Sequence, residues 1–177
     1  LLALAVAAYQ TIVPQWGAWR NDVTLMASAS VAAVVQLTLL AIAFAALTHA
    51  YLISDFSVLN VAENSHTMKP LLYKISGVWG NHEGSMLLWV LILALFGAAV
   101  AVFGNNLPDT TKARILSVQG SIGLAFLVFI AIASNPFIRL MPAPVEGNGL
   151  NPILQDPALA FHPPFLYAGY VGLSIAF

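Results

Sequence analysis

The sequence contains no cysteine and very little charge: of its 177 residues, six are lysine or arginine and seven are aspartate or glutamate. These charged residues make up 7% of the chain, whereas a soluble domain carries roughly 25%. So little charge cannot cover a surface in water, and an apolar content of 60% excludes a disordered chain. Without cysteine, this chain has no disulfide, thiolate nucleophile or cysteine-ligated metal site. A net charge of −1 without a basic run argues against a nucleic-acid partner.

Long hydrophobic runs are present instead, and the mean hydropathy is +0.87. A helix that spans a bilayer needs about 20 mostly apolar residues. The candidate segments are residues 1–16, 31–53, 85–103, 115–133 and 163–177. The sequence therefore predicts an all-α, polytopic membrane protein with about five segments in one domain over residues 1–177. Its first and last segments are cut short by the ends of the sequence, so we interpret the chain as a piece of a longer protein.

The connections between these segments alternate between short and long, at residues 17–30, 54–84, 104–114 and 134–162. Seven of the ten prolines lie from Pro136 to Pro164, which predicts an ordered, non-helical last connection. Three of the six basic residues fall in the two short connections, where their density favours a cytoplasmic position. The long connections would then face outside, which in a bacterium is the periplasm.

His162 directly precedes Pro163 and Pro164, where the fifth predicted segment enters the membrane. Proline suits the first turn of a helix, and the residue before a proline is kept out of the α region. We therefore expect His162 to be extended, with its ring pointing along the membrane surface. Neutral imidazole is a common axial ligand of haem iron, although the ring could instead only cap the helix.

The surroundings of His162 suggest what such a ligand could hold. Haem is flat and apolar with two carboxylates, and a wall for its ring could come from Phe161, Phe165, Leu166 and Tyr170. Positive charge for the two propionates could come from Lys69, Lys74 or Arg139. This is a hypothesis from residue type and position.

A dense polar cluster at the start of the third segment contains His82. Asn81 or Ser85 could cap that helix, and Glu83 would be stabilised by its positive end. Capping does not explain why Trp79 and His82 lie in the same cluster. His82 could be a ligand, a hydrogen-bond partner or a packing residue. Of the other two histidines, we expect His49 to pack near a segment end and His66 to be a solvated loop residue.

Two ordered motifs resemble a known family. Residues 79–89, Trp-Gly-Asn-His-Glu-Gly-Ser-Met-Leu-Leu-Trp, resemble the WGxHEGSxLLW signature of the CcmF family of cytochrome c-type biogenesis proteins. Residues 146–172 are similar to the EGxxLNPLLQDPxLxxHPPxLYxGYVG block of that family. The resemblance runs over nearly the whole chain, which would be the N-terminal portion, and NrfE-type paralogues share the two blocks.

The resemblance implies a haem lyase subunit of the bacterial inner membrane. Such a protein binds haem b at the periplasmic face and promotes its covalent thioether attachment to the CxxCH motif of apocytochrome c. The implied partners are the haem chaperone CcmE and subunits of the CcmH, CcmG and CcmI type. His162 would be the first of two histidines that ligate the haem iron. The other candidate haem-binding residues are His82, Glu83, Trp79, Pro163 and Tyr167.

Two other kinds of protein remain as alternatives, a fragment of a transporter or permease and a structural subunit of a respiratory complex. Transporters place ionisable residues near the bilayer midplane, whereas every Asp, Glu, Lys and Arg here falls at a segment end or in a connection. A structural subunit would leave the ordered connection at residues 134–162 without a role. Haem binding by the full-length protein would separate the first interpretation from both alternatives.

Overall fold

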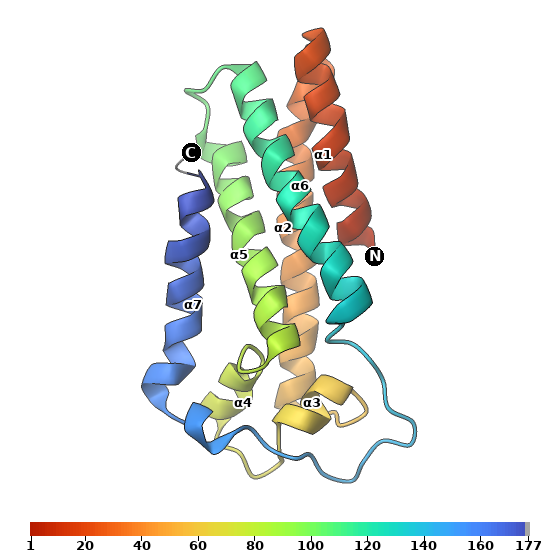
Figure 1. The fold of residues 1–177 in the computed structure, drawn as a ribbon, viewed down its shortest axis with the longest axis vertical. Helices are drawn as coiled ribbons and strands as arrows, with labels where there is room; N and C mark the ends of the chain where they lie inside the picture. Colours follow the sequence, from red (N-terminus) through yellow and green to blue (C-terminus); the bar gives the residue numbers. More distant parts are fainter. Residues whose placement is uncertain (176–177) are drawn as a thin grey trace.

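The computed structural model describes residues 1–175, and its α-helices run side by side as a bundle with a layer of loops at one end (Figure 1). The bundle helices are α1 (Leu2–Arg20), α2 (Val23–Leu52), α5 (His82–Phe103), α6 (Asp109–Ala133) and α7 (Pro157–Gly172). Two short helices and two 3-10 turns complete the fold: α3 (Leu59–Asn64), α4 (Leu71–Gly77), η1 (Pro152–Leu154) and η2 (Leu173–Ile175). Within the described residues the only bridge between extended segments joins Val58 to Arg139. The predicted all-α fold is therefore confirmed.

Three of these helices, α2, α5 and α6, are long and apolar enough to cross a membrane. Helix α1 has 19 residues, but they include Gln10, Gln15 and Pro14. Helix α7 has 16 residues, which at 1.5 Å per residue reach about 24 Å, less than the roughly 30 Å hydrocarbon core. Over residues 1–175, three helices are membrane-capable, fewer than the predicted number of about five segments.

Helices α2 and α7 begin earlier than hydropathy predicts, because aspartate side chains cap them. The Asp22 carboxylate accepts hydrogen bonds from the backbone N–H groups of Thr24 (2.9 Å) and Leu25 (3.1 Å). Helix α2 therefore starts at Val23 rather than at Val31, and the left-handed residue Asn21 ends α1 directly before it. The predicted connection at residues 17–30 is almost entirely helical, and only Asn21 and Asp22 separate the two helices.

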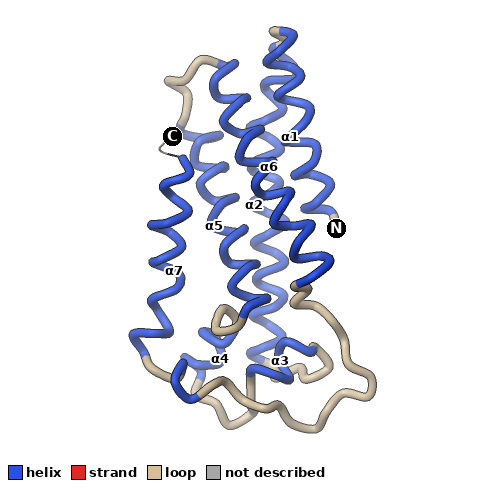
Figure 2. Tube along the Cα trace, in the orientation of Figure 1, coloured by secondary structure: helices blue, strands red, loops and turns tan. Residues whose placement is uncertain are grey.

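The two long connections lie at the same end of the bundle, as expected from their alternation (Figure 2). Their backbones pair: Leu59 N–H donates to Ile138 C=O at 2.8 Å, and Asn148 N–H donates to Ala62 C=O at 2.7 Å. This pairing and the helices α3 and α4 make the end an ordered layer, which we call the loop layer (residues 54–81 and 134–156).

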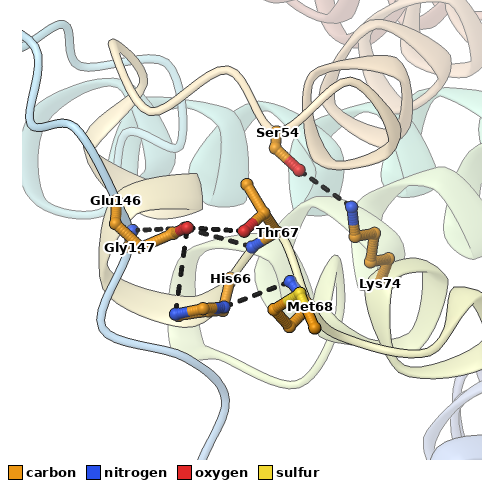
Figure 3. Close-up of polar contacts among 7 residues, drawn as sticks. All are labelled: Ser54, His66, Thr67, Met68, Lys74, Glu146 and Gly147. Atoms are coloured by element: carbon orange, nitrogen blue, oxygen red, sulfur yellow. Dashed lines mark hydrogen bonds and ion pairs between the residues drawn. The ribbon is translucent and has the colours of Figure 1, made fainter.

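Glu146 joins the two connections within the loop layer (Figure 3). Its carboxylate accepts hydrogen bonds from the hydroxyl of Thr67, from the backbone N–H of Thr67 at 3.0 Å and from the backbone N–H of Gly147 at 3.0 Å. The imidazole Nε2 of His66 lies 3.9 Å away. These hydrogen bonds, that from the Thr67 hydroxyl foremost, lower the pKa of Glu146 to about 2.

We expect this junction to open in acid. Because folding lowers the pKa of Glu146, the contribution to stability is complete above roughly pH 5 and is lost as the pH falls through about 2. Hydrogen exchange of residues 144–149, corrected for its intrinsic pH dependence, should accelerate over that range in the full-length protein. Glu146→Gln should exchange faster at neutral pH and show no such step. A step of the same size in Glu146→Gln would contradict the assignment.

Candidate functional site

The start of α5 is organised around Asn81, which caps the helix as predicted. Its side-chain oxygen accepts the backbone N–H of Gly84 at 2.8 Å, and its amide donates to the C=O of Gly77 at 2.8 Å. The hydroxyl of Ser85, the other candidate cap, instead donates to the C=O of Trp79 at 2.6 Å. The two side chains hold residues 77–85 as a tight turn into the helix.

A buried polar network continues from Asn81 into the loop layer. The amide of Asn60 donates to the Asn81 oxygen at 2.8 Å and to the Glu83 carboxylate at 3.3 Å. The hydroxyl of Tyr51 donates to the Asn60 side-chain oxygen at 2.7 Å and accepts from the Asn81 amide at 3.0 Å. Glu83 thus contacts α3. Asn60 and Tyr51 were not predicted from the sequence, although Asn60 is the single polar residue in the apolar run 58–62.

His82 is the first residue of α5 and is exposed. Its Nδ1 lies 3.0 Å from the hydroxyl of Ser134, and its ring meets the ring of Phe129 edge-on at 6.1 Å between centroids. These two contacts, one to Nδ1 and one to Phe129, hold the imidazole ring of His82 in place.

Helix α7 begins at Pro157, six positions before the predicted start, so the expectation of an extended His162 is wrong. The Asp156 carboxylate accepts the backbone N–H groups of Ala158 (2.8 Å) and Leu159 (3.1 Å), and Pro157 occupies the first turn. The helix continues through Pro163 and Pro164. His162 is therefore helical.

Trp79 supplies a hydrogen bond that α7 loses because of its prolines. Pro164 has no N–H to donate to the C=O of Ala160, four residues earlier. The indole Nε1 of Trp79 donates to that carbonyl at 2.9 Å, and Ala160 is buried. This bond joins the two sequence motifs, 81 residues apart, and fixes α7 beside the start of α5 (Figure 1).

A groove of about 450 Å³ lies between the start of α5 and α7. Four of the predicted site residues line it, namely Trp79, His82, Pro163 and Tyr167. Further apolar lining comes from Met86, Leu150, Leu154, Leu159 and Ala160. The hydroxyl of Ser76, which also lines the groove, is buried without a hydrogen-bond partner among the described residues. The groove thus offers apolar walls, an imidazole and a hydroxyl, a combination typical of ligand sites of this size.

His162 does not line this groove. It is exposed and lies on the face of α7 that carries Phe165 and Leu166, three and four residues further on. The predicted apolar wall is indeed exposed, with Phe161 54%, Phe165 75%, Leu166 51% and Tyr170 66% accessible. The structure therefore separates His162 from the groove that His82 lines. Within residues 1–175, no three His, Asp or Glu side chains gather as a metal site.

The basic residues proposed for the haem propionates have other partners in the structure. Lys69 donates to the C=O of Asn64 at 3.0 Å, and burial lowers the pKa of Lys69 to about 8. Lys74 donates to the hydroxyl of Ser54 at 2.9 Å (Figure 3). None of these cations lines the groove.

The loop layer contains Arg139 and His66, and helix α2 contains His49. Arg139 pairs with Asp55 at 2.8 Å. His66 lies in the loop layer with a side chain that is 39% exposed, and its Nδ1 accepts the backbone N–H of Met68 at 3.1 Å. His49 lies exposed near the end of α2.

Comparison with known proteins gives consistent matches. Residues 79–177 match the family described as Cytochrome C assembly protein. The chain is 63% identical to the cytochrome c-type biogenesis protein ccl1 of Rhodobacter capsulatus, over all of this chain and 27% of that protein. It is 60% identical to the cytochrome c-type biogenesis protein CycK of Rhizobium meliloti, over all of this chain and 26% of the relative. A solved structure described as Cytochrome c Heme Lyase CcmF superposes with a TM-score of 0.85 at 28% identity, over 98% of this chain and 27% of that one.

Proposed function

Since the chain belongs to the cytochrome C assembly protein family, we propose that it binds haem b as cargo for cytochrome c maturation. The chain spans about a quarter of the length of the curated relatives that it matches, so it would supply one part of a larger haem site. The names of those relatives, cytochrome c-type biogenesis proteins, support this process.

The observation that carries the proposal is the exposed imidazole of His162 on an exposed apolar face of α7. Haem iron accepts a neutral imidazole as axial ligand, and the macrocycle needs an apolar surface. Phe165 and Leu166 lie beside His162 on that face and provide one. The Trp79 bond to the C=O of Ala160 holds this turn of the helix and so fixes where the ligand stands.

The groove is a second candidate position for the same cargo. Its volume, its apolar lining and the unpartnered hydroxyl of Ser76 favour a bound apolar molecule with polar groups at its edge. His82 would be the imidazole in that case. The two positions lie on different faces of α7, so variants of the two histidines distinguish them.

The chemistry proposed for the whole protein needs mainly positioning. A cysteine thiol of the CxxCH motif adds across a haem vinyl group: the C–S bond forms, and the thiol hydrogen goes to the neighbouring vinyl carbon. Holding the haem at a fixed place for the apocytochrome supplies much of the rate of such an addition. This is the haem lyase activity that we propose for the full protein.

We place the protein in the inner membrane of a bacterium, with the loop layer in the periplasm. The three membrane-capable helices and the common position of both long connections support this placement. The partners that fit this function are the haem chaperone CcmE, which would deliver the haem, and subunits of the CcmH, CcmG and CcmI type.

The test uses the full-length gene carrying His162→Ala in a strain without the native protein. Loss of an outer-shell partner of a metal ligand lowers metal affinity or activity roughly 10–100-fold. His162→Ala removes the proposed ligand itself, so we expect the amount of covalent cytochrome c to fall at least tenfold. Added imidazole should restore part of it. The matched control is His49→Ala, which removes another exposed histidine and should leave assembly unchanged.

Two results would overturn the assignment of His162. Normal assembly by His162→Ala at normal protein level would show that this residue is not a haem ligand. Lost assembly in His82→Ala, rescued by imidazole, together with normal assembly in His162→Ala, would move the site to the groove.

A further inference from the structure

Three glutamines from three helices meet in the interior of the bundle, away from the haem site. Gln10 of α1, Gln36 of α2 and Gln119 of α6 are only 3%, 6% and 6% exposed. Gln36 and Gln119 lie near the middle of helices that can cross a membrane. A buried polar side chain at this depth is costly unless its polar atoms are hydrogen-bonded.

Two of the glutamines have only half of their hydrogen bonds. The Gln10 amide donates to the C=O of Leu116 at 2.9 Å, and the Gln119 amide donates to the C=O of Leu93 at 2.7 Å. These bonds fix the orientation of both amides, because only the NH₂ group can donate to a carbonyl. The Oε1 atoms of both side chains are left without a partner among the described residues. Each of these two oxygens therefore lacks a hydrogen-bond donor.

Gln36 has no hydrogen-bond partner at either end of its amide among the described residues. Its side chain lines a cavity of about 20 Å³ together with Gln10 and Gln119. The rest of the lining is small or apolar and includes Ala7, Ala33, Leu93 and Gly97. A water molecule requires roughly 10–15 Å³ of such volume and two to four polar partners. The cavity meets both conditions and is too small for a larger ligand.

We propose that this cavity is a water-binding site that links α1, α2 and α6 in the interior of the bundle. Bound water donates to the Oε1 atoms of Gln10 and Gln119 and accepts from the Gln36 amide. Water fits this set because it both donates and accepts, and one molecule partners three of the four atoms: the two Oε1 atoms and the Gln36 NH₂ group. Polar contacts of this kind hold helices together in a bilayer, where lipid supplies no hydrophobic drive for their association.

The direct test is proton-detected solid-state NMR of the full-length protein in lipid. Magnetisation from water should reach the side-chain amide of Gln36, and Gln36→Leu should abolish the signal from the cavity. High-resolution density for a water within hydrogen-bond distance of the three side chains would agree. The absence of both the transfer and the density would overturn the proposal. Density that changes when sodium is replaced by a larger cation would replace the water site with a cation site.

The stability of Gln36→Leu is an independent test, because a water-filled and a dry cavity predict changes in opposite directions. If water bridges the glutamines, leucine removes it and leaves the Gln10 and Gln119 oxygens unpartnered, so the unfolding equilibrium constant should rise about tenfold or more. If the cavity is dry, leucine replaces an unpartnered buried amide, and the constant should fall. Gln15→Leu is the control, because Gln15 is exposed on α1 and should change little. A stabilised Gln36→Leu would overturn the proposal. If that variant does not fold, the NMR measurement on the unaltered protein decides.

Discussion

Replacing Gly84 by alanine should nearly abolish the folded protein. A Cβ atom at this position would lie 1.6 Å from the backbone oxygen of Val78 and 2.8 Å from its carbonyl carbon. Val78 is fully buried, so its backbone cannot move away. The turn that Asn81 caps would have to open, and we expect a destabilisation of more than about 4 kcal/mol, the range of the most severe single substitutions. Membrane accumulation of the full-length protein and its thermal midpoint measure this.

Gly169→Ala is the matched control. Gly169 also lies in a helix, α7, but nothing lies within 4 Å of its added Cβ. Alanine is the better helix former by about 1 kcal/mol, so the control should be neutral or slightly stabilised. Normal accumulation of Gly84→Ala, or equal loss in both variants, would show that the close approach at α5 is not what requires glycine.

The second large effect is expected for Asn81→Ala. This side chain caps α5 by accepting the Gly84 N–H, and it also bonds to Gly77, Tyr51 and Asn60. Alanine removes the cap and leaves several buried polar groups without a partner. A lost cap costs about 1 kcal/mol and each buried unpartnered group roughly 1–3 kcal/mol, so we expect a total loss of about 3 kcal/mol or more. Unfolding of the full-length protein in mixed micelles would measure it.

Asn105→Ala removes the same amide from an exposed position between α5 and α6. Surface substitutions of this kind usually change stability by less than about 0.5 kcal/mol. A difference of under 1 kcal/mol between the two variants would contradict the role given to the network. The network matters for function because Trp79, two residues before Asn81, holds α7 and therefore the turn that carries His162.

The sequence by itself determined the class of the protein. With 7% charge and apolar runs long enough to span a bilayer, a helix satisfies the backbone within each segment, and no tertiary information was needed. It also indicated Asn81 as one of two candidate caps, with Ser85, since a cap is a local arrangement of residues three positions apart. The common end of the two long connections followed from the alternation of segments.

The structure corrected where two helices begin, and only the tertiary packing decided what their polar residues contact. Hydropathy scores residues one by one, so it missed the first turns of α2 and α7, which begin at the caps Asp22 and Asp156. It could not show that His162 is helical, because the bond from Trp79 to the C=O of Ala160, which satisfies the carbonyl left by Pro164, joins residues 81 positions apart. Partners of buried polar groups come from distant parts of the chain, and their positions are fixed only when the helices pack.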